Sequence, residues 1–155
     1  MLPFAFPFWS HCLLLAFLAA VNFLSASYGS ALLGASRFRI KQALENRDLP
    51  ASGFLAKAAE DDPSILMRVD LLYVSSTAVF ICLGVWQIIR DDGSLSPSHY
   101  IRGAAVFILA LFLLRMAANP LGGRFSEKLV VGAALPMVVL TAPFLPLARL
   151  ALAAG

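Results

Sequence analysis

SASYGSALLGASRFRIKQAL, residues Ser25 to Leu44, joins a run of small and hydroxyl side chains to three closely spaced cations, Arg37, Arg39 and Lys41. The residues before it are almost all apolar, and those after it alternate between apolar and charged. An apolar helix that stops at a cluster of cations is typical of a membrane span reaching the cytoplasmic surface. We therefore predict that this stretch is the inner end of a first transmembrane helix.

The composition of the 155-residue chain also indicates a membrane protein. Hydrophobic residues make up 60% of it and charged residues 14%, and the mean hydropathy is +0.82. Soluble domains carry about a quarter charged residues. Eleven charges lie between Arg37 and Arg68, whereas the apolar segments hold almost none besides Asp70 and Arg115. We expect an all-α membrane protein surrounded by a lipid bilayer.

Three transmembrane helices are expected within a single domain, residues 1–155. They cover about residues 10–35, 69–89 and 100–118, each long enough for a hydrocarbon core. Residues 36–62 alternate apolar and charged side chains and break near Pro50, which predicts a cytoplasmic juxtamembrane helical hairpin. Asp62 and Pro63 suit a turn before the second span, with Ser64 near its start.

The C-terminal segment, residues 127–154, leaves two alternatives open. After its first two residues it is apolar apart from Arg149, so hydropathy alone predicts a fourth span. Its prolines, Pro136, Pro143 and Pro146, interrupt helical hydrogen bonding, and a break exposed to lipid is costly. A bent helix that packs on the other helices or lies along the interface is the other possibility.

The orientation follows from the distribution of cations. The loop from Arg37 to Arg68 has six, the turn between the second and third spans has two, and the N-terminus has none. The first loop is therefore expected in the cytoplasm and the N-terminus outside, in a cell (inner) membrane. The apolar start has no preceding cation, which favours an uncleaved span over a secretory signal.

The first span carries two neighbouring stripes of small and polar residues. Asn22, Ser25, Ala26 and Gly29 share one stripe, and Ser27, Ser30 and Gly34 share the other. Small residues are enriched where membrane helices pack closely. The same residues could instead line a polar path or an ion site. Both interpretations remain open from the sequence.

Two charged residues lie inside the predicted spans. Asp70 is about one turn into the second span, and Arg115 is near the end of the third. A charge within a span is expensive unless it is paired or hydrated. If these spans are antiparallel neighbours, Asp70 and Arg115 are at the same level and form a structural ion pair.

Several function classes are not expected. The net charge of +3 comes from scattered cations without the clustered basic face of a nucleic-acid-binding protein. Cys12 and Cys82 lie in apolar segments, and His11 and His99 lie on separate elements, so neither pair has the spacing of a metal site. The lone serines lack a base or a carboxylate pair, so we expect neither an enzyme nor a cofactor.

Three short motifs carry a family resemblance: Ser36-Arg37-Phe38-Arg39-Ile40, Glu60-Asp61-Asp62-Pro63 and Gly122-Gly123-Arg124-Phe125-Ser126-Glu127-Lys128-Leu129. Together with the apolar tail broken by prolines, they resemble the transmembrane domain of the CNNM/CorC (cyclin M, haemolysin-related) magnesium/cobalt transport family. That family follows a small-residue first span with S-R-x-R-L, a hairpin ending near D-P, and later G-A-R-Y-P-E-R-L. The resemblance spans nearly the whole chain and is one of layout more than of signature.

The chain departs from the family where the family's ion chemistry lies. The glutamate of the first-span motif falls on Gly29, the second-span asparagine is missing at Val74, and Arg115 stands where the third span has a glutamate. The intracellular CBS pair typical of the family is absent from these residues. The resemblance implies Mg²⁺ as substrate and a degenerate ion site, with these candidate ligands: Ser25, Ser27, Ser30, Asp70, Ser75 and Thr77.

Two functional hypotheses follow from the resemblance. In the first, the chain exports Mg²⁺ or another divalent cation from the cytoplasm as a homodimer. In the second, it is a structural or regulatory subunit that forms a heterodimer with a full-length family paralogue and transports no ion itself. The small-residue face would then be a contact surface, and Asp70 with Arg115 would be structural.

Overall fold

The computed structural model describes residues 8–45, 51–91 and 97–154. All regular structure in these residues is helical, which confirms the predicted all-α fold. Helices suit a bilayer because each backbone N–H and C=O is satisfied within its own segment. The elements are α1 (Phe8–Gly34), α2 (Arg37–Glu45), α3 (Ser52–Ala59), α4 (Pro63–Asp91), α5 (Pro97–Arg124), α6 (Ser126–Gly132), α7 (Ala134–Thr141), the 3₁₀ helix η1 (Ala142–Phe144) and α8 (Leu145–Ala154).

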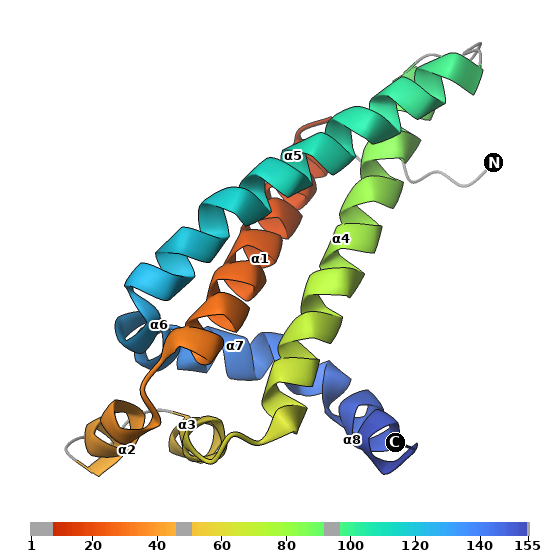
Figure 1. The fold of residues 1–155 in the computed structure, drawn as a ribbon. Coiled ribbons are helices and arrows are strands. Elements are labelled where there is room, and N and C mark those ends of the chain that lie inside the picture. The colour runs from red at the N-terminus through yellow and green to blue at the C-terminus, as the bar shows by residue number, and fades with distance from the viewer. Residues whose placement is uncertain (1–7, 46–50, 92–96, 155) are drawn as a thin grey trace.

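Helices α1, α4 and α5 form an elongated three-helix bundle (Figure 1). Helix α1 packs against both of the others, and α4 runs antiparallel to α1 and α5. The short helices α2, α3, α6 and α7 gather at the end of the bundle where α1 stops and α4 begins. We call this the closed end, and the opposite end the open end.

Four stretches of the described residues are long and apolar enough to cross a membrane: Trp9–Gly34, Pro63–Ile88, Tyr100–Arg124 and Ala134–Ala153. Many large apolar side chains on the bundle are exposed, for example Leu13 at 71% and Val106 at 64%. Trp9 and Trp86 lie near the open end, at positions where membrane proteins often place interfacial aromatics. An apolar surface of this extent indicates a lipid environment.

The C-terminal segment adds a fourth such stretch to the three predicted spans, but it is not a straight helix. It is broken at Ala133 and at η1, and it runs crosswise beneath the bundle (Figure 1). Each of the three prolines lies in the first turn of its helix: Pro136 in α7, Pro143 in η1 and Pro146 in α8. A missing N–H costs no hydrogen bond at these positions. Of the two alternatives for this segment, the arrangement agrees with the bent helix.

One helix boundary agrees with the sequence and another differs from it. Helix α4 begins at Pro63, with Ser64 near its start as predicted, because the Asp62 carboxylate accepts a hydrogen bond from the Ser64 N–H at 2.9 Å and caps the helix. Helix α5 continues past Ala118 and Pro120 to Arg124. The Ser30 hydroxyl donates to the Asn119 carbonyl at 3.0 Å, and this tie to α1 helps to hold the extra turn in place.

The buried core lies at the closed end. Tyr28 is fully buried, donates its hydroxyl to the Val130 carbonyl at 3.1 Å, and packs its ring near that of Phe54. One side chain therefore joins α1 to both α6 and α3. Other fully buried side chains surround it: Leu55, Ile65, Val69 and Met137.

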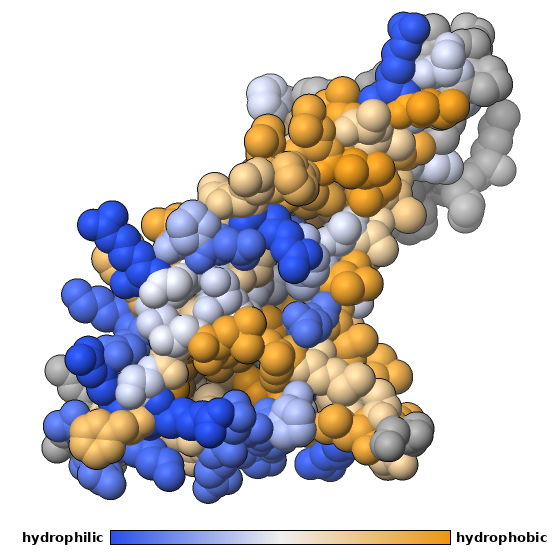
Figure 2. Space-filling model, in the orientation of Figure 1, coloured by the Kyte–Doolittle hydropathy of each residue, from blue (hydrophilic) through white to orange (hydrophobic). Residues whose placement is uncertain are grey.

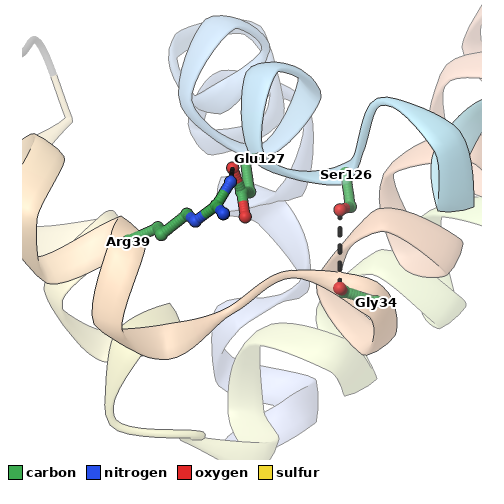
Figure 3. A network of polar contacts seen from close by, with 4 residues as sticks. All are labelled: Gly34, Arg39, Ser126 and Glu127. Carbon is green, nitrogen blue, oxygen red and sulfur yellow. Dashed lines mark hydrogen bonds and ion pairs between the residues drawn. The ribbon is translucent and has the colours of Figure 1, made fainter.

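Polar contacts also tie α6 to the junction between α1 and α2 (Figure 3). Arg39 forms an ion pair with Glu127 at 2.9 Å, and the Ser126 hydroxyl donates to the Gly34 carbonyl at 3.4 Å. Arg37 pairs with Asp61 at the start of the turn into α4. The predicted junction at the end of the first span is thus the point where the closed end is assembled.

Candidate functional site

A polar cavity of ≈340 Å³ lies between α1, α4 and α5, toward the closed end. Hydrophilic side chains gather at mid-height on the face between α5 and α4, within a largely hydrophobic surface (Figure 2). Polar groups at this depth of a bundle are expensive and usually functional. The cavity is lined by Ser25, Ala26, Gly29, Ser30 and Leu33 of α1, Leu66, Asp70 and Tyr73 of α4, and Arg115 and Asn119 of α5.

The small residues of α1 create the space for this cavity. Serine, alanine and glycine fill little volume beside the larger side chains of α4 and α5. A Cβ atom built on Gly29 would lie 3.6 Å from Val69 Cγ1, an ordinary contact. Gly29 is therefore not required for close helix packing, and a side chain at this position is next to the cavity.

The second small-residue stripe of α1 packs instead against α5. A Cβ atom on Gly122 would lie 2.3 Å from the Ser27 carbonyl oxygen and 2.8 Å from Ser30 Cβ. Only glycine permits such a close approach of the two backbones. The small residues of α1 thus serve both purposes: Ser25, Ala26, Gly29 and Ser30 line the cavity, and the backbone around Ser27 and Ser30 packs against Gly122 of α5.

Asp70 and Arg115 line the same cavity from opposite helices. The Arg115 guanidinium lies over the Tyr73 ring, 4.8 Å from its centroid, in a cation–π contact. The ion pairs found among the described residues do not include Asp70 with Arg115. Both side chains are exposed in the isolated chain, so the cavity presents one carboxylate and one guanidinium to a ligand.

The serine hydroxyls of the cavity keep acceptor capacity. Ser25 donates to the Asn22 carbonyl at 3.0 Å, and Ser30 donates to the Asn119 carbonyl. A hydroxyl that donates its proton to a carbonyl still has lone pairs on its oxygen. With the carboxylate of Asp70, the cavity therefore offers several oxygen ligands of the kind that Mg²⁺ prefers.

A buried polar contact lies next to the cavity on the side of the open end. Asn22 is fully buried, and its amide donates to Thr77 Oγ1 at 2.6 Å and to Ser76 Oγ at 3.2 Å. Its Oδ1 has no hydrogen-bond partner among the residues that the structure describes. Amide and hydroxyl side chains join membrane helices in this way, so Asn22 connects α1 to α4 above the cavity.

The predicted ion ligands separate into three groups. Ser25, Ser30 and Asp70 line the cavity, and Thr77 accepts the hydrogen bond from Asn22. Ser27 lies outside the cavity because residues two apart on a helix face nearly opposite directions. Ser75 is half-buried on α4 and does not line the cavity.

Some cavity residues were not predicted as site residues, namely Tyr73 and Asn119, and neither was the adjacent Asn22 contact. Asn22 has a detectable signal, since it is a lone amide within an apolar span. Asn119 does not, because it lies just beyond the predicted end of the third span at residue 118. In the described residues, no group of three His, Cys, Asp or Glu side chains is placed to hold a metal ion.

The segments that carry the family resemblance meet at the closed end. The serine-arginine motif joins α1 to α2, the acidic turn joins α3 to α4, and the double-glycine motif joins α5 to α6. The Arg37–Asp61 and Arg39–Glu127 ion pairs connect the first motif to each of the other two. Comparison of the chain with protein-family models, curated proteins and solved structures found no match.

Proposed function

We propose that the chain is a multi-pass membrane protein of the CNNM/CorC type whose cavity binds a divalent cation, with Mg²⁺ as the substrate to be exported. The observation that carries this proposal is the convergence of Asp70, Ser25, Ser30 and Asn119 on one cavity. These side chains supply a carboxylate, two hydroxyls and an amide oxygen. Mg²⁺ is bound through one or two carboxylates while it retains several waters, and a cavity of ≈340 Å³ has room for them.

The proposed orientation places the closed end in the cytoplasm. Most of the cations in the described residues lie on elements of this end, including Arg37, Arg39, Lys57, Arg124 and Lys128. The positive-inside rule then places α2 and α3 on the cytoplasmic side of a cell (inner) membrane. A cavity near that side receives its ion from the cytoplasm, which is the direction that export requires.

Arg115 makes the proposed site degenerate. Its fixed charge cancels that of Asp70 and repels a divalent ion in the same cavity. A divalent cation bound to Asp70 would share the cavity with the guanidinium, and the repulsion between the two charges lowers the affinity for the ion. We infer that Arg115 acts as a tethered cation that limits ion occupancy.

Flux into proteoliposomes tests this proposal. Vesicles that enclose a Mg²⁺-sensitive dye should report slow flux with the wild type, none with Asp70→Ala, and at least about tenfold faster flux with Arg115→Gln. Ser75→Ala is the matched control, because Ser75 is on α4 but outside the cavity. Wild-type and Arg115→Gln flux no faster than in empty vesicles would remove ion transport as the function.

A second function, that of a structural or regulatory subunit, is favoured by the exposure of the cavity. Asp70 and Arg115 are exposed on a face that would otherwise meet lipid, at an energetic cost. A second copy of the chain or a family paralogue packed on this face would cover both charges. The protein would then be a homodimer or a heterodimer.

Cross-linking distinguishes a homodimer from a heterodimer. Val74 is 61% exposed next to Tyr73, so a cysteine at this position, in a variant lacking Cys12 and Cys82, reports on contacts of the cavity face. A homodimer gives a covalent dimer of the purified chain, and a heterodimer gives an adduct only in native membranes. A variant that stays monomeric in both would contradict the subunit function.

A further inference from the structure

A second, apolar groove lies where α1 meets the end of α5 and the start of α6. Its volume is ≈330 Å³, similar to that of the polar cavity, but its walls are almost entirely hydrophobic. Lys128 is the charged residue among the groove residues, and the aromatic and aliphatic walls come from three helices. The lining consists of Phe23, Leu24, Ser27, Leu121, Phe125, Lys128 and Leu129.

Two features show what kind of molecule this groove accepts. Ser27 lines the groove and is 1% exposed, and within the described part of the chain its hydroxyl has no hydrogen-bond partner, so the groove wall holds an unused donor. Lys128 adds a positive charge, and Arg124 contributes a second one beside the groove, over the Phe125 ring at 5.7 Å. The complementary ligand has a long apolar part, an acceptor oxygen within it and an anionic end.

We propose that this groove is a binding site for an anionic phospholipid. An acyl chain would lie against the apolar walls, the ester carbonyl would accept a hydrogen bond from the Ser27 hydroxyl, and the phosphate would pair with Lys128 and Arg124. Basic pockets between transmembrane helices on the cytoplasmic side bind anionic headgroups, and each cation near the surface strengthens such binding. The site is separate from the ion cavity and does not depend on cation transport.

Thermal unfolding of the purified full chain in detergent tests the preference for an anionic lipid. Dioleoyl phosphatidylglycerol should raise the midpoint at a lower concentration than dioleoyl phosphatidylcholine, because only the former offers a net negative charge. Lys128→Gln should raise the required phosphatidylglycerol concentration about fivefold. Lys41→Gln is the matched control, since Lys41 is exposed at the same end but does not line the groove.

Two further arms test the groove itself. Leu121→Trp fills the groove and should remove stabilisation by phosphatidylglycerol, and glycerol 1-phosphate, which has no acyl chain, should give none with the wild type. The glycerol 1-phosphate experiment remains informative even if Leu121→Trp does not fold. The proposal is overturned if phosphatidylcholine stabilises equally, if Lys41→Gln weakens binding as much as Lys128→Gln, or if glycerol 1-phosphate replaces the lipid.

Discussion

Two adjacent glycines on α5, Gly122 and Gly123, meet different surroundings. A Cβ atom on Gly122 would collide with the Ser27 carbonyl oxygen, whereas one on Gly123 would have no atom of another described helix within 4 Å. We therefore expect Gly122→Ala to separate α1 from α5 and cost about 1–3 kcal/mol of stability. Gly123→Ala should be neutral or slightly stabilising in the same thermal-unfolding assay, and equal losses in the two variants would contradict the close approach.

Asn22 is expected to hold α1 against α4. Asn22→Ala removes the hydrogen bonds to Thr77 and Ser76, and interhelical hydrogen bonds in membrane proteins contribute about 0.6 kcal/mol on average and up to about 1.7. The midpoint of unfolding in detergent should fall accordingly. Ser75→Ala is the control on α4, the helix that holds the two acceptors, and a similar loss there would show that the effect is not specific to this contact.

The interaction of Asp70 with Arg115 remains a prediction at the residue scale. Since the two side chains share the cavity without forming an ion pair, we expect a coupling energy below about 1 kcal/mol between Asp70→Asn and Arg115→Gln in a double-mutant cycle of stability. A coupling energy of 3 kcal/mol or more, as found when a buried pair is broken, would show instead that the pair is structural.

At the scale of elements, the start of α4 depends on its cap and hence on pH. The hydrogen bond from the Ser64 backbone N–H lowers the pKa of the Asp62 carboxyl, assisted by the Ser64 side chain, Lys57 and Arg68. Because the folded-state pKa is the lower one, this stabilisation is complete above the unfolded pKa near 4 and is lost as the pH falls through the folded value.

Substitutions of Asp62 check this account. Asp62→Ala should cost about 1 kcal/mol at neutral pH, while Asp62→Asn, which is also a good cap, should cost little. The difference in stability between wild type and Asp62→Asn should shrink as the pH falls from 5 toward 3. If Asp62→Asn loses stability at low pH as the wild type does, a group other than Asp62 causes that loss.

Some helix boundaries could be predicted from the sequence and others could not. The first span ends at Gly34, as the cations of α2 predict, because both charge and hydropathy change at that point. The extension of α5 through Pro120 was not predictable from local signals. It depends on tertiary contacts of α5 with α1, at Ser30 and through Gly122, and no pattern within α5 reports these contacts.

For the whole molecule, the sequence located the charges of the candidate site better than its neutral members. Asp70 and Arg115 are conspicuous because charge is rare inside the spans, and the structure brings both to one cavity. Helical periodicity also grouped Ser25 with Gly29 correctly. It could not tell which of the small residues line the cavity and which pack against α5, since this depends on how α4 and α5 are placed around α1.

We propose that one cavity holds both a cation-binding carboxylate, Asp70, and a guanidinium that opposes it, Arg115. Mg²⁺-dependent thermal stabilisation of the detergent-purified protein tests it most directly, in the wild type, Arg115→Gln and the double variant Asp70→Asn/Arg115→Gln. Arg115→Gln should be stabilised at a Mg²⁺ concentration at least about tenfold below that of the wild type, and the double variant should lose this gain. Equal Mg²⁺ dependence in all three proteins would contradict it.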